Sequence, residues 1–157
     1  MSESREIRQL LSIIDQAYDH RSWHGTNLRG SIRGLSAARA ARRPRPGRHN
    51  IWELVVHAAY WKYAVTRRLT GQKRGSFPLK GSNWFPRTQS PSEEQWRDDV
   101  ALLEKTHRAL REAVANLSSG DLSRTPKGRS TSNAFLITGI AAHDLYHAGQ
   151  IQLLKKL

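Results

Sequence analysis

His143 and His147 lie four residues apart in the segment His-Asp-Leu-Tyr-His near the end of the chain. On a helix this spacing places both side chains on one face, where two imidazoles can bind the same metal ion. Both histidines also belong to an apolar stripe, which faces a core rather than solvent and whose other members are Leu136, Ile140, Ile151 and Leu154. Because two nitrogens rarely hold a divalent ion alone, we expect a third ligand from another helix.

His57 is the best candidate for that third ligand. It stands one helical turn from both Leu54 and Trp61, at the edge of another apolar stripe. A single inward-facing histidine is usually a hydrogen-bonded core residue. Three of them on two helices would instead form a facial set with open positions for water or substrate. All-imidazole ligation suits Zn, Ni, Fe or Cu, so these residues do not select the ion.

Four residues are expected to border the metal or its pocket: Glu53, Trp61, Asp144 and Gln150. Glu53 precedes His57 by four residues and could orient its imidazole. The simpler interpretation is a capping box with Asn50, in which Glu53 is the third helical residue. Asp144 follows His143 directly, about 100° around the helix, so it cannot share that histidine's direction. We expect it to support a ligand or contact another helix.

Proton transfer has only weak candidates, His107 and Tyr146. His107 falls on a heptad-like apolar seam, where a hydrogen-bonded core histidine is the simpler interpretation. Tyr146 is three residues after His143 and could border the site or pack in the bundle. The chain has no cysteine and shows neither paired carboxylates nor a Ser-His-Asp arrangement. If there is catalysis, the metal carries most of it.

Several segments together resemble the DinB-like (damage-inducible) superfamily, in order and over nearly the whole chain. They are Trp23-His24-Gly25, residues 49–62 with His57, Pro91-Ser92-Glu93 with Trp96, and residues 143–151. The resemblance implies one domain over residues 1–157, an all-α four-helix bundle of up-down-down-up topology with a long crossover loop between the second and third helices. It also implies a divalent metal (Zn, Ni or Fe) on His57, His143 and His147. Some relatives are metal-dependent thiol S-transferases, isomerases or hydrolases.

The apolar periodicity predicts the helices that position these residues. Long helices are expected over about 4–19, 50–70, 91–117 and 133 to near the C-terminus, with a shorter one over 27–34. Residues 36–49 form a basic connector. The loop over 71–90 is long enough to return along a helix if its two neighbours run parallel. Its Trp84-Phe85-Pro86 segment could fold over the metal as a lid or patch the bundle surface. We expect Trp23 to pack in the core, or alternatively to form a pocket wall, and we expect Ser90 to cap the third long helix.

Composition limits the possible partners. The net charge of +13 is spread along the chain, and no nucleic-acid-binding signature is present, so a nucleic-acid partner is not favoured. The sequence has no apolar run long enough to predict a membrane span, and no signal-peptide core is evident at the N-terminus. The absence of cysteine is consistent with the cytoplasm. A small-molecule substrate is expected, and a homodimer is plausible for a bundle with exposed aromatic residues.

Two hypotheses follow for function. A divalent ion on three neutral imidazoles keeps its full charge and would lower the pKa of a bound thiol or water. The first hypothesis is therefore a metal-dependent transferase or hydrolase, using a low-molecular-weight thiol in place of a protein cysteine. The second is a non-catalytic stress-response module in which the metal is structural or regulatory. The first predicts a site that solvent can reach, and the second predicts a closed one.

Overall fold

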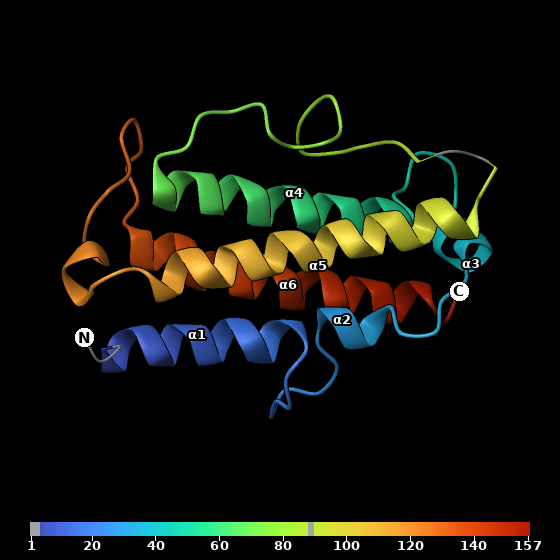
Figure 1. The fold of residues 1–157 in the computed structure, drawn as a ribbon. Helices are drawn as coiled ribbons and strands as arrows, with labels where there is room; N and C mark the ends of the chain where they lie inside the picture. The colour runs from blue at the N-terminus through green and yellow to red at the C-terminus, as the bar shows by residue number, and fades with distance from the viewer. Residues whose placement is uncertain (1–3, 88–89) are drawn as a thin grey trace.

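Helices carry the whole fold in the computed structural model, which describes residues 4–87 and 90–157 (Figure 1). The elements are α1 (Arg5–Tyr18), α2 (Leu28–Ser31), α3 (Ala37–Ala41), α4 (Ile51–Thr70), α5 (Glu93–Ala115), the short 3-10 helix η1 (Ser119–Asp121) and α6 (Asn133–Leu154). No strand occurs in these described ranges. The predicted all-α fold is confirmed. No helix in the same ranges is long and apolar enough to cross a membrane.

The four long helices lie side by side as a bundle. Figure 1 shows α1 and α6 running toward the end where the chain terminates, and α4 and α5 running the opposite way. The loop that follows α4 travels along the outside of that helix, back to the end where α5 begins. A loop of this length inside a small domain usually has a role of its own. Here it contributes to the site described below.

Helix α4 is the central element. Its N-terminus is fixed by a capping box in which the Asn50 side chain accepts from the Glu53 backbone N–H, while Glu53 accepts from the Asn50 backbone N–H. Every residue from Ile51 to Ala59 is buried, because α3, α5 and α6 all pack against this helix. It ends at Gly71, whose φ of 72° is a left-handed conformation that glycine adopts without strain. His57 is therefore carried by a rigid, fully enclosed segment.

Helix α6 carries the other two histidines. Ser132 caps its first turn by accepting from the Phe135 backbone N–H. Its inner side is buried through Ile137, Ile140, Ala141, Ala148 and Ile151. Of the predicted stripe, Ile140, His147 and Ile151 are buried, whereas Leu136, His143 and Leu154 are half-buried at its edge. The side chains of His143 and His147 point toward His57 of α4.

The structure corrects three local predictions. Trp23 is 100% exposed rather than packed in the core, because residues 19–27 form a loop that projects from the bundle. Ser92, not Ser90, caps α5, since its side chain accepts from the Gln95 backbone N–H. The basic connector includes the short helix α3, capped by Ser36.

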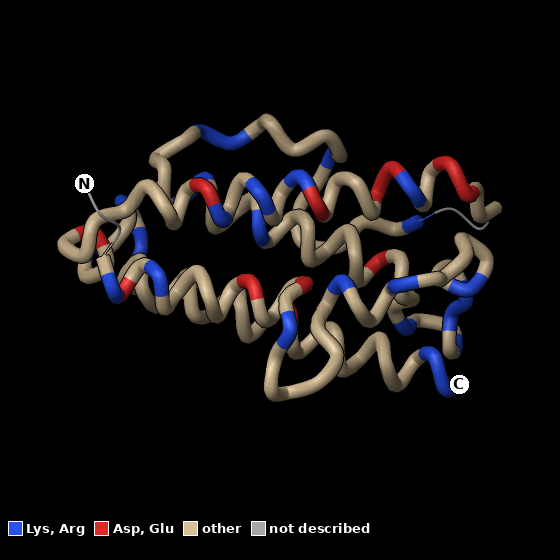
Figure 2. Tube along the Cα trace, turned by 60° about the horizontal axis from the view of Figure 1, so that its bottom comes forward, with Lys and Arg blue, Asp and Glu red and all other residues tan. Residues whose placement is uncertain are grey.

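Basic residues occur along the whole bundle, and several of them gather at the end where the chain terminates (Figure 2). There the loop over 42–48 lies against the end of α6. Arg39 donates to the Lys155 carbonyl at 3.4 Å and Arg42 donates to the Leu157 carbonyl at 3.0 Å.

Candidate metal centre

The three predicted histidines converge. Nε2 of His143 lies 3.1 Å from Nε2 of His57 and 3.0 Å from Nε2 of His147. With a typical metal–imidazole bond of about 2.1 Å, nitrogens separated by about 3 Å are close enough to bind one ion together. Among the residues the structure describes, these three histidines form the group of potential ligands that could hold a metal ion.

Hydrogen bonding fixes where the imidazole lone pairs point. Nδ1 of His57 lies 2.8 Å from the Asn83 carbonyl, and Nδ1 of His147 lies 2.7 Å from Oε1 of Gln150. Both partners are acceptors, so each Nδ1 carries the proton and each Nε2 presents a lone pair. These two lone pairs face the same atom, Nε2 of His143, which can offer a proton to only one of them. A cation at the centre would satisfy all three nitrogens.

Burial keeps these histidines neutral, which is the state that binds metal. Loss of solvation lowers the pKa of His57 to about 4 and that of His143 to about 3. It also lowers the pKa of His147. The side chains of His57 and His147 are only 5% and 4% exposed. Burial therefore disfavours the charged imidazolium form at all three histidines.

The loop after α4 supplies one wall of the site. Trp84 stacks on His57 with ring centroids 3.9 Å apart, and on its other side it stacks on His49 at 3.6 Å. Asn83 has a φ of 65°, a left-handed conformation that asparagine tolerates better than most residues. Its side-chain oxygen accepts from Trp61 Nε1 at 2.9 Å. Trp61 thus holds the backbone that orients His57.

Sequence reasoning missed Asn83. The loop shows no helix or strand pattern, so the only available signal is an asparagine directly before the Trp84-Phe85-Pro86 segment. Phe85 of that segment is buried against Tyr60 and Phe77. The segment is therefore anchored in the core while Trp84 covers the face of His57.

Glu53 stabilises the start of α4 instead of contacting His57. Its carboxylate accepts from Arg43 Nη2 at 2.6 Å and from the Asn50 backbone N–H, and it lies 2.9 Å from His49 Nδ1. Both oxygens are occupied by these contacts. Of the two roles considered from the sequence, the structure supports capping.

Asp144 and His107 belong to a buried polar junction that takes one residue from each long helix. Lys62 of α4 donates to Asp144 of α6, and its Nζ lies 3.3 Å from His107 Nδ1 of α5 and 5.0 Å from the ring centroid of Tyr18 of α1. Lys62 is 0% exposed and Asp144 is 1% exposed. The junction ties α4 to α6 and so fixes the distance between His57 and the other two histidines.

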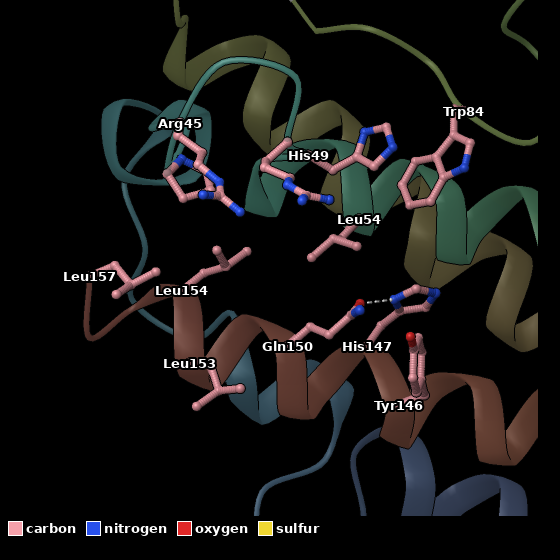
Figure 3. Close-up of a pocket in the computed structure, with 12 residues that line it drawn as sticks. Arg45, His49, Leu54, Trp84, Tyr146, His147, Gln150, Leu153, Leu154 and Leu157 are labelled. Carbon is pink, nitrogen blue, oxygen red and sulfur yellow. Dashed lines mark hydrogen bonds between the residues drawn. The ribbon is translucent and has the colours of Figure 1, made fainter.

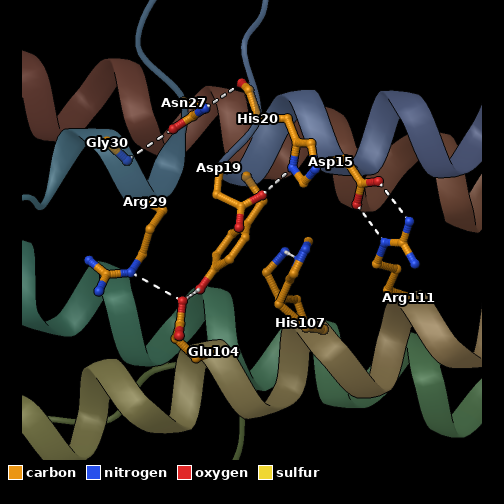
Figure 4. A network of polar contacts seen from close by, with 11 residues as sticks. Asp15, Asp19, His20, Asn27, Arg29, Gly30, Glu104, His107 and Arg111 are labelled. Atoms are coloured by element: carbon orange, nitrogen blue, oxygen red, sulfur yellow. Dashed lines mark hydrogen bonds and ion pairs between the residues drawn. The ribbon is translucent and has the colours of Figure 1, made fainter.

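His107 is occupied in the core and does not reach the histidine cluster. Figure 4 shows His107 projecting from α5. Its ring stacks on that of Tyr18, with centroids 3.7 Å apart. Burial, with a smaller contribution from Lys62, lowers the pKa of His107 to about 3. Tyr146, the other weak candidate, is 65% exposed and meets the His147 ring edge-on at 5.2 Å. Of the two, only Tyr146 borders the cluster.

A pocket of about 670 Å³ opens beside His147 (Figure 3). Its walls come from α4, α6, the 44–49 segment and the loop after α4, and include Leu54, Trp84, Tyr146, Gln150, Leu153 and Leu154. Trp61 and His143 line a smaller hollow of about 150 Å³ on the other side of the cluster. A small molecule in the larger pocket would lie directly against a metal ligand.

Gln150→Ala is expected to weaken metal binding about 10- to 100-fold, because the Nδ1 proton of His147 loses the acceptor that orients the ring. Competition between the protein and a chromogenic chelator for Ni²⁺ or Zn²⁺ measures this affinity. Gln152→Ala on the same helix is the matched control, since its side chain contacts Thr26 and Lys155 instead. Equal affinities for the two variants would contradict the orienting role of Gln150.

Comparison with known proteins agrees with the geometry. A protein-family model described as the DinB superfamily matches residues 20–151, a span that includes all three converging histidines, Asn83 and Lys62. No curated protein and no solved structure gave a significant match. The family model covers most of the chain, and the chain belongs to the DinB superfamily.

Proposed function

We propose that this protein is a metal-dependent enzyme of the DinB superfamily that transfers or hydrolyses a group on a small molecule, with a low-molecular-weight thiol or water as the attacking species. One observation carries the proposal: three neutral imidazole nitrogens converge beside an open pocket. A divalent ion bound there would supply Lewis acidity, lowering the pKa of a thiol or water or polarising a carbonyl. His57, His143 and His147 would hold it.

The chain's own residues determine how such a site works. Trp84 covers one face of His57, and Asn83 and Gln150 fix the orientation of two imidazoles. The pocket against His147 gives a substrate access from one side. The chain contains no cysteine, so a thiol nucleophile must enter as a second small molecule. This requirement is consistent with a thiol-dependent transferase.

A non-catalytic metal-binding module is the second candidate. The tight enclosure of the ligands favours it, because His57 and His147 are nearly inaccessible and two tryptophans surround His57. Nor does any Asp, Glu or Lys side chain hydrogen-bond to the three imidazoles in the ranges 4–87 and 90–157. In this case the ion would be structural or regulatory.

Spectroscopy with Co²⁺ as the probe metal separates the two candidates. The enzyme hypothesis expects a small thiol such as 2-mercaptoethanol to add a near-ultraviolet charge-transfer band to the Co²⁺-loaded protein, because sulfur reaches an open position. His147→Ala should show neither Co²⁺ binding nor the band. A Co²⁺ spectrum that excess thiol leaves unchanged would indicate a closed site and favour the module.

A further inference from the structure

We infer that the pocket beside His147 binds an amphipathic anion. The ligand would have a hydrocarbon body, one anionic end held by Arg45 and Arg48, and its opposite end directed at His147. This inference rests on the proposed function for what happens at the His147 end, and it assigns the chemical class of the substrate.

The pocket selects a hydrocarbon body because its walls are mainly apolar. Leu54 and Leu154 form its inner surface, and the rings of Trp84 and Tyr146 close its sides. Leu153 and Leu157 are both 71% exposed. Exposed large apolar side chains that gather around one cavity mark a binding surface, since burying them from water is favourable. The volume of about 670 Å³ is in the range of small-molecule sites.

The charge at the mouth selects an anion. Arg42 and Arg43 of the same loop are engaged, the first with the Leu157 carbonyl and the second with Glu53. Arg45 and Arg48 line the pocket, and their guanidinium groups have no ion-pair or hydrogen-bond partner within the described part of the chain. Guanidinium groups bind carboxylates and phosphates with two parallel hydrogen bonds. Two free ones facing an apolar cavity complement an anion attached to a hydrocarbon.

The loop that carries these arginines is held in place before any ligand binds. The Arg48 backbone N–H donates to the Arg45 carbonyl at 3.2 Å, and the Arg48 carbonyl accepts from Arg43. Arg43 is in turn paired with Glu53 at the start of α4, and His49 is stacked on Trp84. Less ordering is therefore required on binding, which favours affinity.

The two functional ends of the pocket are separated. Figure 3 shows Arg45 and His147 at opposite ends, with Leu54 and Leu154 between them. An anion held at the arginines leaves the rest of the molecule to extend along the leucines toward the histidine cluster. The anionic group would thus act as a remote handle whose binding energy positions the reacting end.

Isothermal titration with decanoate tests this assignment. Decanoate should bind the wild type, and Arg45→Ala/Arg48→Ala should bind it at least about tenfold more weakly, since both anion contacts are lost. The control Arg21→Ala/Arg33→Ala removes the same amount of charge at exposed positions outside the pocket. Its affinity for decanoate should stay within about twofold of wild type. Decan-1-ol, which lacks the charge, should bind the wild type at least about tenfold more weakly than decanoate.

Repeating the titration on wild-type protein with excess EDTA distinguishes this inference from the proposed function. The chelator removes any bound metal and leaves every pocket residue in place, so decanoate affinity should stay within about threefold of the value without EDTA. No decanoate binding to the wild type, or equal binding by the Arg45/Arg48 variant, would overturn the inference. So would loss of binding on chelation alone, because the carboxylate would then bind at the metal. Failure of the metal proposal would leave the arginine dependence intact.

Discussion

His147→Ala, purified without added metal or a polyhistidine tag, is expected to contain almost no divalent metal, whereas the wild type should contain close to one equivalent. The substitution removes one of three converging Nε2 atoms and leaves two nitrogens, which rarely retain a divalent ion. Affinity should fall by more than about 100-fold, beyond the 10- to 100-fold effect of losing an orienting partner. Elemental analysis by mass spectrometry measures the content and names the ion.

His24→Ala provides the matched control, because it removes an exposed histidine that is not part of the cluster. Its metal content should equal that of wild type. Circular dichroism must show that His147→Ala retains its helices, so that loss of metal reports on the site. A wild type that stays metal-free after incubation with Zn²⁺, Ni²⁺ or Fe²⁺ would reduce the three histidines to core residues.

The common direction of His143 and His147 could be predicted from the sequence because helical periodicity is a local property. His143 and His147 are one turn apart whatever surrounds them, and their apolar neighbours fix which way the pair faces. The capping box at Asn50 and Glu53 is equally local, and it set the start of α4 to the residue. Each of these features depends on residues that lie within a turn or two of one helix.

Features made by the long loop could not be predicted in this way. The contact of Asn83 with His57 joins residues 26 apart, and the stacking of Trp84 on both His49 and His57 depends on the loop's path. No periodicity encodes such a path. The prediction for Trp23 failed for a related reason, since a large aromatic side chain favours the core only when its backbone reaches it. Trp23 lies in a loop that projects from the bundle, so its side chain does not reach the core.

Lys62 shows the same limit inside the helices. By sequence it is one polar residue in a mostly apolar helix, and its partners Asp144 and His107 lie 82 and 45 residues away. Only the bundle brings one polar side chain from each long helix to a common point. Burial raises the pKa of Asp144. The adjacent Lys62 ammonium lowers this pKa but does not cancel the effect of burial.

Lys62→Met is therefore expected to reduce the free energy of unfolding by about 3–5 kcal/mol at pH 7, because it leaves the Asp144 carboxylate buried without a counter-ion. Methionine keeps most of the volume, so the effect reports on charge rather than on a cavity. Urea denaturation in the presence of a chelator measures it without metal linkage. The surface pair of Arg29 and Glu104 is the control, and Arg29→Met should cost less than about 1 kcal/mol.

The double variant Lys62→Met/Asp144→Leu isolates the cause. Apolar replacement of a whole buried ion pair is often nearly neutral, so the double variant should recover most of the stability lost in Lys62→Met. The single variant should also recover partly as the pH is lowered. Burial raises the folded-state pKa of Asp144 above its unfolded value, so the folded state takes up a proton first and the penalty shrinks toward acid. A loss in Lys62→Met that is under about 1 kcal/mol, or unchanged from pH 7 to pH 5, would show that the junction is solvated.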